Sequence, residues 1–107
     1  MAKWTEIGPV SDFAGADKTC VRISDKPLVI CRIDDQWFCI LNVCPHAGLP
    51  LGEGDLRGSI LTCPFHGYTY NVKNGVNIDF PTEEPPVSTF AIKVDSEQVF
   101  VDLEPTN

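Results

Sequence analysis

The 107-residue sequence lacks the features of several protein classes. It has no apolar run of about 18 residues, the length that a transmembrane helix requires. Residues 1–6 lack the continuous apolar core of a signal peptide. No G-x-G-x-x-G motif follows a strand-like segment, so no flavin or nicotinamide site is recognisable. We therefore expect a cytoplasmic protein without a membrane partner.

Basic residues are also scarce. Eight Lys and Arg residues stand against 15 Asp and Glu residues, which gives a formal net charge of −7. Nucleic acids and anionic membranes attract positive protein surfaces, so neither is an expected partner. Two interpretations of the acidic surface remain open: it keeps the protein in solution, or it steers the protein towards a basic docking patch on a redox partner.

Short apolar runs dominate the sequence, and no long stripe of period 3.6 competes with them. This pattern predicts an all-β, antiparallel fold in a single domain that spans residues 1–107. The Asp34-Asp35 and Asn74-Gly75 pairs predict tight hairpins, and a helical turn is expected near residues 11–13. The expected strands are 4–7, 19–23, 28–33, 36–41, 59–62, 68–72, 76–78, 87–94 and 99–103.

The only two histidines both follow cysteines, in Cys44-Pro45-His46 and Cys63-Pro64-Phe65-His66. Two thiolates and two imidazoles can hold one tetrahedral zinc ion. They can also hold a [2Fe–2S] cluster in which two histidines replace two cysteines on one iron. A separate mononuclear iron site of two histidines and a carboxylate is excluded, because the pairs use every histidine. We therefore expect no oxygenase active site, and no enzyme.

The runs 44–51 and 63–68 resemble the two cluster loops of the Rieske family, and the proline-rich segment 81–86 stands where the family has a third, covering loop. The resemblance implies a Rieske-type antiparallel β-sandwich with a small cluster-binding subdomain inserted at about residues 42–80. It implies one [2Fe–2S] cluster as cofactor. In this pattern one iron is bound by the thiolates and the other by neutral imidazoles. The implied ligands are Cys44, His46, Cys63 and His66.

The resemblance also assigns roles to neighbours of these ligands. Gly48 and Gly67 would let the backbone turn sharply beside the cluster. Leu49 and Phe65 stand where high-potential members carry two further cysteines, so the disulfide of those members is absent. With the covering loop, these two side chains would exclude water from the cluster.

The expected reduction potential follows from charge. Two Fe³⁺ ions, two sulfides and two thiolates sum to zero, so an added electron meets a neutral cluster. Rieske centres accordingly span about −150 to +300 mV, against about −400 mV for plant-type ferredoxins. High-potential members place a serine hydroxyl on a bridging sulfide where this chain has Tyr68. This difference favours a reduction potential at the low end of the Rieske range. Tyr70 stands where those members place a tyrosine against a cysteine sulfur; ordinary strand packing is the alternative.

The resemblance implies a one-electron carrier, the ferredoxin component of an aromatic-ring dioxygenase system or related hydroxylase. Its partners would be a flavin-dependent ferredoxin reductase and a terminal oxygenase. One alternative is the small subunit of an assimilatory nitrite reductase, whose partner would be the large subunit. An alternative of another class is a structural zinc-binding interaction module. The substrate of the system is not encoded in this sequence.

The other three cysteines, Cys20, Cys31 and Cys39, each lie in an apolar run. We expect them to be buried free thiols that act as small apolar residues in a reducing compartment. Trp4 and Trp37 are expected to be core or strand residues rather than electron relays.

Overall fold

The computed structural model describes residues 4–13, 15–45, 48–65 and 67–106. Within them the chain forms a six-stranded antiparallel sheet of order β1-β9-β8-β4-β3-β2 and a three-stranded sheet of order β5-β6-β7. The prediction of an all-β antiparallel fold is confirmed. The strands are β1 (Trp4–Pro9), β2 (Lys18–Ile23), β3 (Lys26–Ile33), β4 (Gln36–Leu41), β5 (Leu56–Arg57), β6 (Ile60–Thr62), β7 (Thr69–Asn71), β8 (Thr89–Asp95) and β9 (Gln98–Pro105).

Two short 3₁₀ helices complete the described elements, η1 (Val10–Phe13) and η2 (Leu51–Glu53). The first confirms the turn expected near residues 11–13, and it buries the Phe13 ring. None of the helices in the described residues has the length and apolar character to cross a membrane.

Three hairpins of the large sheet close through two-residue turns at Ser24-Asp25, Asp34-Asp35 and Ser96-Glu97. All six turn residues have positive φ, between 49° and 65°. Such turns match the right-handed twist of the flanking strands, and Asp tolerates this backbone region better than most residues do. The hairpin predicted at Asp34-Asp35 is confirmed.

The hairpin predicted at Asn74-Gly75 is confirmed as a reversal of the chain, because the Asn71 N–H group donates to the Val76 carbonyl oxygen at 3.0 Å and the Ile78 N–H group donates to the Thr69 carbonyl oxygen at 2.8 Å. The strand predicted at 76–78 is wrong. This stretch makes one isolated antiparallel bridge, between Tyr70 and Asn77. The Asn77 Oδ1 atom accepts hydrogen bonds from the backbone N–H groups two and three residues further on, at 3.1 and 2.9 Å. A side chain that binds nearby backbone in this way offers an alternative to a ladder and ends the strand. A short strand, β5, lies instead where a loop was expected.

Strands β3 and β4 form a wall between two apolar cores. Leu28 and Ile30 of β3 face one core, while Val29 and Cys31 face the other, as the two-residue period of a strand requires. We name the first the body core; its buried members are Phe13, Leu28, Ile30, Cys39, Phe90, Val99 and Val101. We name the second the cluster core; its buried members are Val29, Cys31, Ile40, Cys44, Leu51, Leu61, Cys63, Tyr70, Val72 and Val87.

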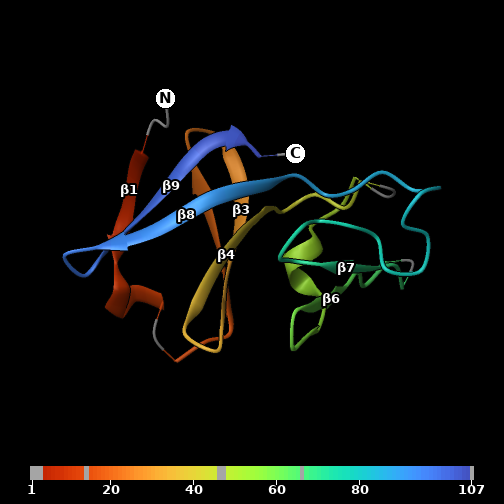
Figure 1. The fold of residues 1–107 in the computed structure, drawn as a ribbon, viewed down its shortest axis with the longest axis horizontal. Helices are drawn as coiled ribbons and strands as arrows, with labels where there is room; N and C mark the ends of the chain where they lie inside the picture. Colours follow the sequence, from red (N-terminus) through yellow and green to blue (C-terminus); the bar gives the residue numbers. More distant parts are fainter. Residues whose placement is uncertain (1–3, 14, 46–47, 66, 107) are drawn as a thin grey trace.

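Residues 42–88 leave the large sheet after β4 and return to it at β8, and they carry the small sheet at one end of the molecule (Figure 1). We call this segment the insert. Asn42 Oδ1 accepts a hydrogen bond of 2.6 Å from the Gly52 N–H group, which ties η2 to the end of β4. A Cβ atom at Gly52 would overlap the Cys20 sulfur, so glycine is needed for this close contact between insert and body. The two ends of the insert lie side by side, because the Leu41 N–H group at the end of β4 donates to the Ser88 carbonyl oxygen at 2.9 Å.

All five cysteines lie within the described residues, and none forms a disulfide. Cys31 and Cys39 are buried, and burial raises the pKa of each thiol to about 12. The expectation that Cys20 is buried is wrong: it lies exposed on β2, which is an edge strand of the large sheet.

Of the two tryptophans, Trp37 is half-buried and packs edge-on against Phe13, with 5.8 Å between the ring centroids. Trp4 lies on strand β1 but is 38% exposed.

Candidate metal centre

The two Cys/His loops have the same backbone hydrogen bonds. In the first loop, the Cys44 N–H group donates to the Leu49 carbonyl oxygen at 2.8 Å, and the Cys44 carbonyl oxygen accepts from the Gly48 N–H group at 2.8 Å. In the second loop, the Cys63 N–H group donates to the carbonyl oxygen five residues further on at 2.7 Å, and its carbonyl oxygen accepts from Gly67 at 2.9 Å. The backbone N–H and carbonyl groups of each cysteine are therefore both hydrogen-bonded within its own loop, which fixes the cysteine at the start of the turn.

Both turns depend on glycine. Gly48 has φ 69° and Gly67 has φ 74°, in the left-handed region that other residues adopt only at a cost. A Cβ atom at either position would meet no described atom within 4 Å. The backbone conformation, rather than lack of space, therefore calls for glycine, as the sharp turn expected from the sequence requires.

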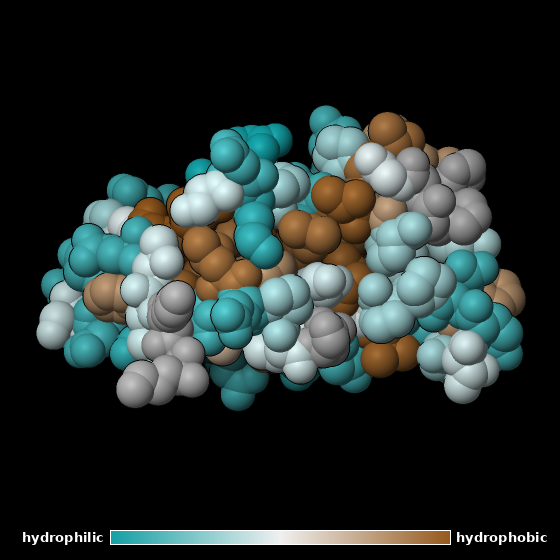
Figure 2. All heavy atoms as spheres, turned by 90° about the horizontal axis from the view of Figure 1, so that it is seen from above, coloured by the Kyte–Doolittle hydropathy of each residue, from teal (hydrophilic) through white to brown (hydrophobic). Residues whose placement is uncertain are grey.

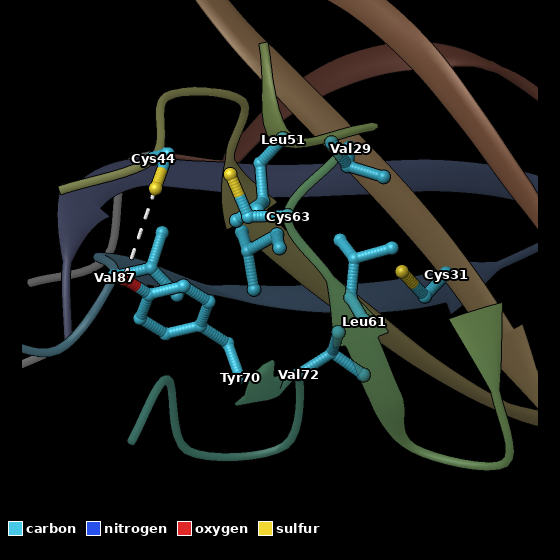
Figure 3. Packing of buried hydrophobic residues seen from close by; sticks show 10 residues of the cluster. Val29, Cys31, Cys44, Leu51, Leu61, Cys63, Tyr70, Val72 and Val87 are labelled. Carbon is cyan, nitrogen blue, oxygen red and sulfur yellow. Dashed lines mark hydrogen bonds between the residues drawn. The ribbon is translucent and has the colours of Figure 1, made fainter. Parts of the chain in front are cut away.

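The loops bring both cysteine side chains into the cluster core. Cys44 and Cys63 are each 0% exposed, and Figure 3 places both sulfur atoms at the same end of this core, away from Cys31. The other two proposed ligands, His46 and His66, lie outside the described residues. The structure thus brings the two predicted thiolates together in a dry site, which suits the sulfur ligands of an iron–sulfur cluster.

Tyr70 lies against the first of these cysteines. Its hydroxyl oxygen is 3.8 Å from the Cys44 sulfur, and the whole side chain is buried (Figure 3). Burial is the main reason that the pKa of Tyr70 lies above its ordinary value, and Cys44 raises it further. The phenol is therefore protonated at neutral pH and has a proton to donate to the sulfur. The contact implied by the resemblance is present; its effect on a cluster stays a prediction.

Apolar side chains come to the surface around the two loops. Leu49 and Phe65 are each 41% exposed, and Phe80 is 43% exposed. Phe80 packs against Tyr68, with 5.8 Å between the ring centroids, so the segment after β7 lies beside the second loop. Figure 2 shows apolar residues exposed among hydrophilic ones along one face, including the end formed by the insert. The shielding of a cluster by Leu49 and Phe65 stays a prediction.

Sequence reasoning missed three residues that shape the site. Val87, at the end of the proline-rich segment, is buried in the cluster core beside Tyr70 (Figure 3). Asn42 ties the insert to the body, and Asn77 lies opposite Tyr70. Asn side chains often accept the backbone N–H group two residues further on, and this turn signal could have indicated Asn77.

Comparison with known proteins decides the family. Residues 3–96 match the family model of the Rieske [2Fe-2S] domain. The chain belongs to the Rieske family. It is 31% identical over 99 residues to ferredoxin CarAc of Metapseudomonas resinovorans, with 92% of each chain covered. It is 28% identical to the ferredoxin component of biphenyl 2,3-dioxygenase from Rhodococcus jostii, with 94% of this chain and 92% of that one covered.

A solved structure agrees with the sequence relatives. The ferredoxin in the complex of reduced oxygenase and oxidized ferredoxin of carbazole 1,9a-dioxygenase superposes with a TM-score of 0.84 and 30% identity. The match covers 97% of this chain and 96% of that one. The predicted Rieske-type fold is confirmed.

Membership settles the cofactor and removes one alternative. The cofactor of this Rieske protein is one [2Fe–2S] cluster, as predicted, so the structural zinc module is excluded. The relatives are electron-transfer components of dioxygenase systems and not themselves the catalysts, which confirms the expectation that the chain is not an enzyme. The matched loops and the two buried thiols fit such a cluster.

Proposed function

We propose that this Rieske protein carries single electrons from a flavin-dependent ferredoxin reductase to the terminal oxygenase of an aromatic-ring dioxygenase system. The observation that carries the proposal is the pair of matched loops, because they account for both histidines and leave none for a second, oxygen-activating iron. The named relatives support this role over that of a nitrite reductase subunit, since they are ferredoxin components of dioxygenases.

We assign the cluster ligands to Cys44 and Cys63 for one iron and to His46 and His66 for the other. When bound, the cluster takes up and releases one electron at a potential set by its histidine ligands and by hydrogen bonds to its sulfurs. The buried thiol positions keep the cysteine ligands away from water, since both side chains are fully buried. The Tyr70 hydroxyl donates towards the Cys44 sulfur and so favours the more negative, reduced state.

We assign docking of the oxygenase to the exposed tip of the insert. Leu49, Phe65 and Phe80 supply an apolar centre there. Asp79 and Glu83 are exposed next to it, and the stretch from 79 to 86 contains no Lys or Arg. An apolar centre with an acidic rim fits a partner surface with basic residues around an apolar patch. The exposed Asp79 and Glu83 carboxylates would contribute to steering towards such a partner.

We further place the protein in the cytoplasm and treat residues 1–107 as one Rieske domain. The cysteines support this location, because none of the five forms a disulfide, and cytosolic proteins rarely carry disulfides. The two cores support a single domain, because β3 and β4 contribute side chains to both.

The proposal is tested by reconstitution with the reductase and hydroxylase encoded beside this protein. We expect hydroxylated product to form from NADH and oxygen only when the holoprotein is added, and a Cys63→Ser variant to give none. A neighbouring gene for a sirohaem reductase, or product formation that does not depend on this protein, would contradict the proposal. The same assay run with several aromatic compounds would identify the substrate class.

A further inference from the structure

The two cluster loops have the same hydrogen bonds near their tips but differ at their bases. The second loop stands on the β6–β7 ladder, in which Thr62 pairs with Thr69. The first loop has no such ladder among the described residues, because the chain enters η2 at Leu51, directly after Pro50. Proline also lacks the N–H group that a ladder needs. The base of the first loop is therefore closed in another way.

The Asn42 side chain closes this base. Its Oδ1 atom accepts a hydrogen bond of 2.6 Å from the Gly52 N–H group, and its own backbone N–H group donates to the Pro27 carbonyl oxygen at 2.8 Å. Because a backbone N–H group can only donate, the atom that it meets is the amide oxygen of Asn42. Asn42 is thus attached to β3 through its backbone and to η2 through its side chain. The side-chain bond spans residues 43–51, which include the first cluster loop.

Gly52 fits tightly at the point where this bond is made. It is buried, and a Cβ atom there would lie 2.9 Å from the Val29 Cγ2 atom and 3.1 Å from the Asn42 oxygen. Its neighbour Leu51 is fully buried in the cluster core (Figure 3). The Asn42 bond therefore fixes the end of the first loop against the body.

The rest of the first loop is not packed against the body. A groove of about 450 Å³ lies between the loop and β2, with Gly48 and Pro50 on one side and Cys20 and Arg22 on the other. Leu49, between the first two, is 41% exposed. A segment with few packed neighbours depends on its hydrogen bonds for its position. The bond at the base is therefore the restraint that ties this loop to the body.

We propose that Asn42 is a positioning residue for the cluster: its side chain closes the first loop and so holds the Cys44 sulfur at the cluster site. The inference rests on the proposed role of Cys44 as a ligand. The backbone bonds of Cys44 run to Gly48 and Leu49 in the same loop, so they do not attach it to the body. Opening of the base lets this loop move as a unit into the groove and carries the sulfur with it. The second loop needs no such residue, because a ladder supports it.

The test compares the wild type, Asn42→Ala, Asn42→Asp and Asn71→Ala, each as holoprotein. Alanine removes the acceptor from the base of the loop, and aspartate restores an acceptor of the same shape. Asn71→Ala is the matched control, because Asn71 is also half-buried and its Oδ1 atom also accepts a backbone N–H group, that of Lys73 at 3.0 Å, outside both loops.

Three measurements are made on each protein. Hydrogen exchange read by mass spectrometry compares peptides from residues 43–52 with peptides from residues 61–70. The EPR spectrum of the reduced protein reports how uniform the cluster geometry is. The rate at which an iron chelator bleaches the visible absorption reports how readily the cluster is lost.

We expect Asn42→Ala to raise exchange in residues 43–52 but not in residues 61–70, and to broaden the EPR features. Loss of the cluster should become about fivefold faster, which corresponds to about 1 kcal/mol, the usual net contribution of one hydrogen bond. Asn71→Ala should match the wild type, and Asn42→Asp should lose its cluster no faster than the wild type does. Equal gains of exchange in both loops with an unchanged EPR spectrum would overturn the proposal, because a residue that only stabilises the whole fold gives that pattern.

The rescue variant keeps the test decisive should Asn42→Ala assemble no cluster. Normal cluster content in Asn42→Asp and Asn71→Ala would then support the proposal, whereas absence of the cluster from Asn42→Asp as well would overturn it. A wild-type protein without a [2Fe–2S] spectrum would instead overturn the proposed function, and the exchange pattern would still report whether Asn42 closes the first loop.

Discussion

The Tyr70 hydroxyl oxygen lies 3.8 Å from the Cys44 sulfur, and both side chains are fully buried. The tyrosine is on β7 of the insert, and the cysteine is in the first cluster loop, 26 residues earlier in the chain. A hydrogen bond in a dry site is stronger than in water, so this contact is well placed to influence a charge that changes on the sulfur.

Tyr70→Phe should lower the reduction potential and leave the cluster intact. The substitution removes only the hydroxyl, and the ring continues to fill the cluster core between Val87 and Val72 (Figure 3). A hydrogen bond to a charged group contributes about 1.5–3 kcal/mol, but only its strengthening on reduction affects the potential. We expect a fall of tens of millivolts, at about 20 mV for each 0.5 kcal/mol. Protein-film voltammetry on the two proteins measures it, and an unchanged or higher potential would show that the hydroxyl does not act on the cluster.

Cys44→Ser and Cys63→Ser should each abolish assembly of the cluster. Both thiols are buried at the start of matched loops, and each variant removes one of the two proposed sulfur ligands. Cys20→Ser is the matched control, because that thiol is exposed and lies outside the loops. Iron and acid-labile sulfide analysis, with visible absorption, measures the outcome. A normal cluster content in either loop variant would contradict the ligand assignment.

Neutralising the acidic rim of the insert should slow electron transfer to the oxygenase. The double variant Asp79→Asn, Glu83→Gln removes two exposed charges beside the apolar tip, and the loss should be largest at low ionic strength, because salt screens surface charge. The control is Asp95→Asn, Glu97→Gln, which removes two exposed charges at the β8–β9 turn, at the end of the body away from the insert (Figure 1). Stopped-flow oxidation of the reduced protein by the oxygenase gives the rates. Equal effects of the two double variants would place docking elsewhere.

Alkylation should distinguish the three cysteines outside the cluster loops. Cys20 is exposed, whereas burial raises the pKa of Cys31 and Cys39 to about 12 and shields both sulfurs. Since the thiolate is the nucleophile, iodoacetamide at pH 8 should label the native holoprotein once, at Cys20. Peptide mass spectrometry identifies the site, and Cys20→Ser should remain unlabelled. Labelling of Cys31 in the native state would mean that the wall between the two cores opens readily.

The strands that form the wall were predictable because their signals are local. The segments 28–33 and 36–41 are rich in strand-forming apolar residues, and Asp34-Asp35 between them fits a two-residue turn. The chain reverses at Asn74-Gly75 as predicted, but its second strand is reduced to a single bridge, because Asn side chains bind neighbouring backbone groups there. The exposure of Cys20 depends on the order of strands in the sheet, which pairs β1 with β9 and leaves β2 at the edge; no local pattern contains that order.

In the candidate site, too, some features follow from local sequence signals and others depend on the folded arrangement. The cysteine and histidine positions follow from spacing within a few residues, and the need for Gly48 and Gly67 follows from the sharp turns that this spacing imposes. The turn role of Asn77 has a local signal, but its position opposite Tyr70 could not be predicted, because it arises from a single bridge that replaced the expected strand.

The central claim is that two cysteines and two histidines hold one [2Fe–2S] cluster that carries a single electron. Pulsed EPR of the dithionite-reduced protein tests it most directly, because imidazole nitrogen bound to iron couples to the unpaired electron. We predict one S = 1/2 signal with coupling to two nitrogens, which integrates to one spin per protein. A signal without nitrogen coupling, as for four cysteine ligands, or a protein that contains zinc and gives no signal, would contradict the account.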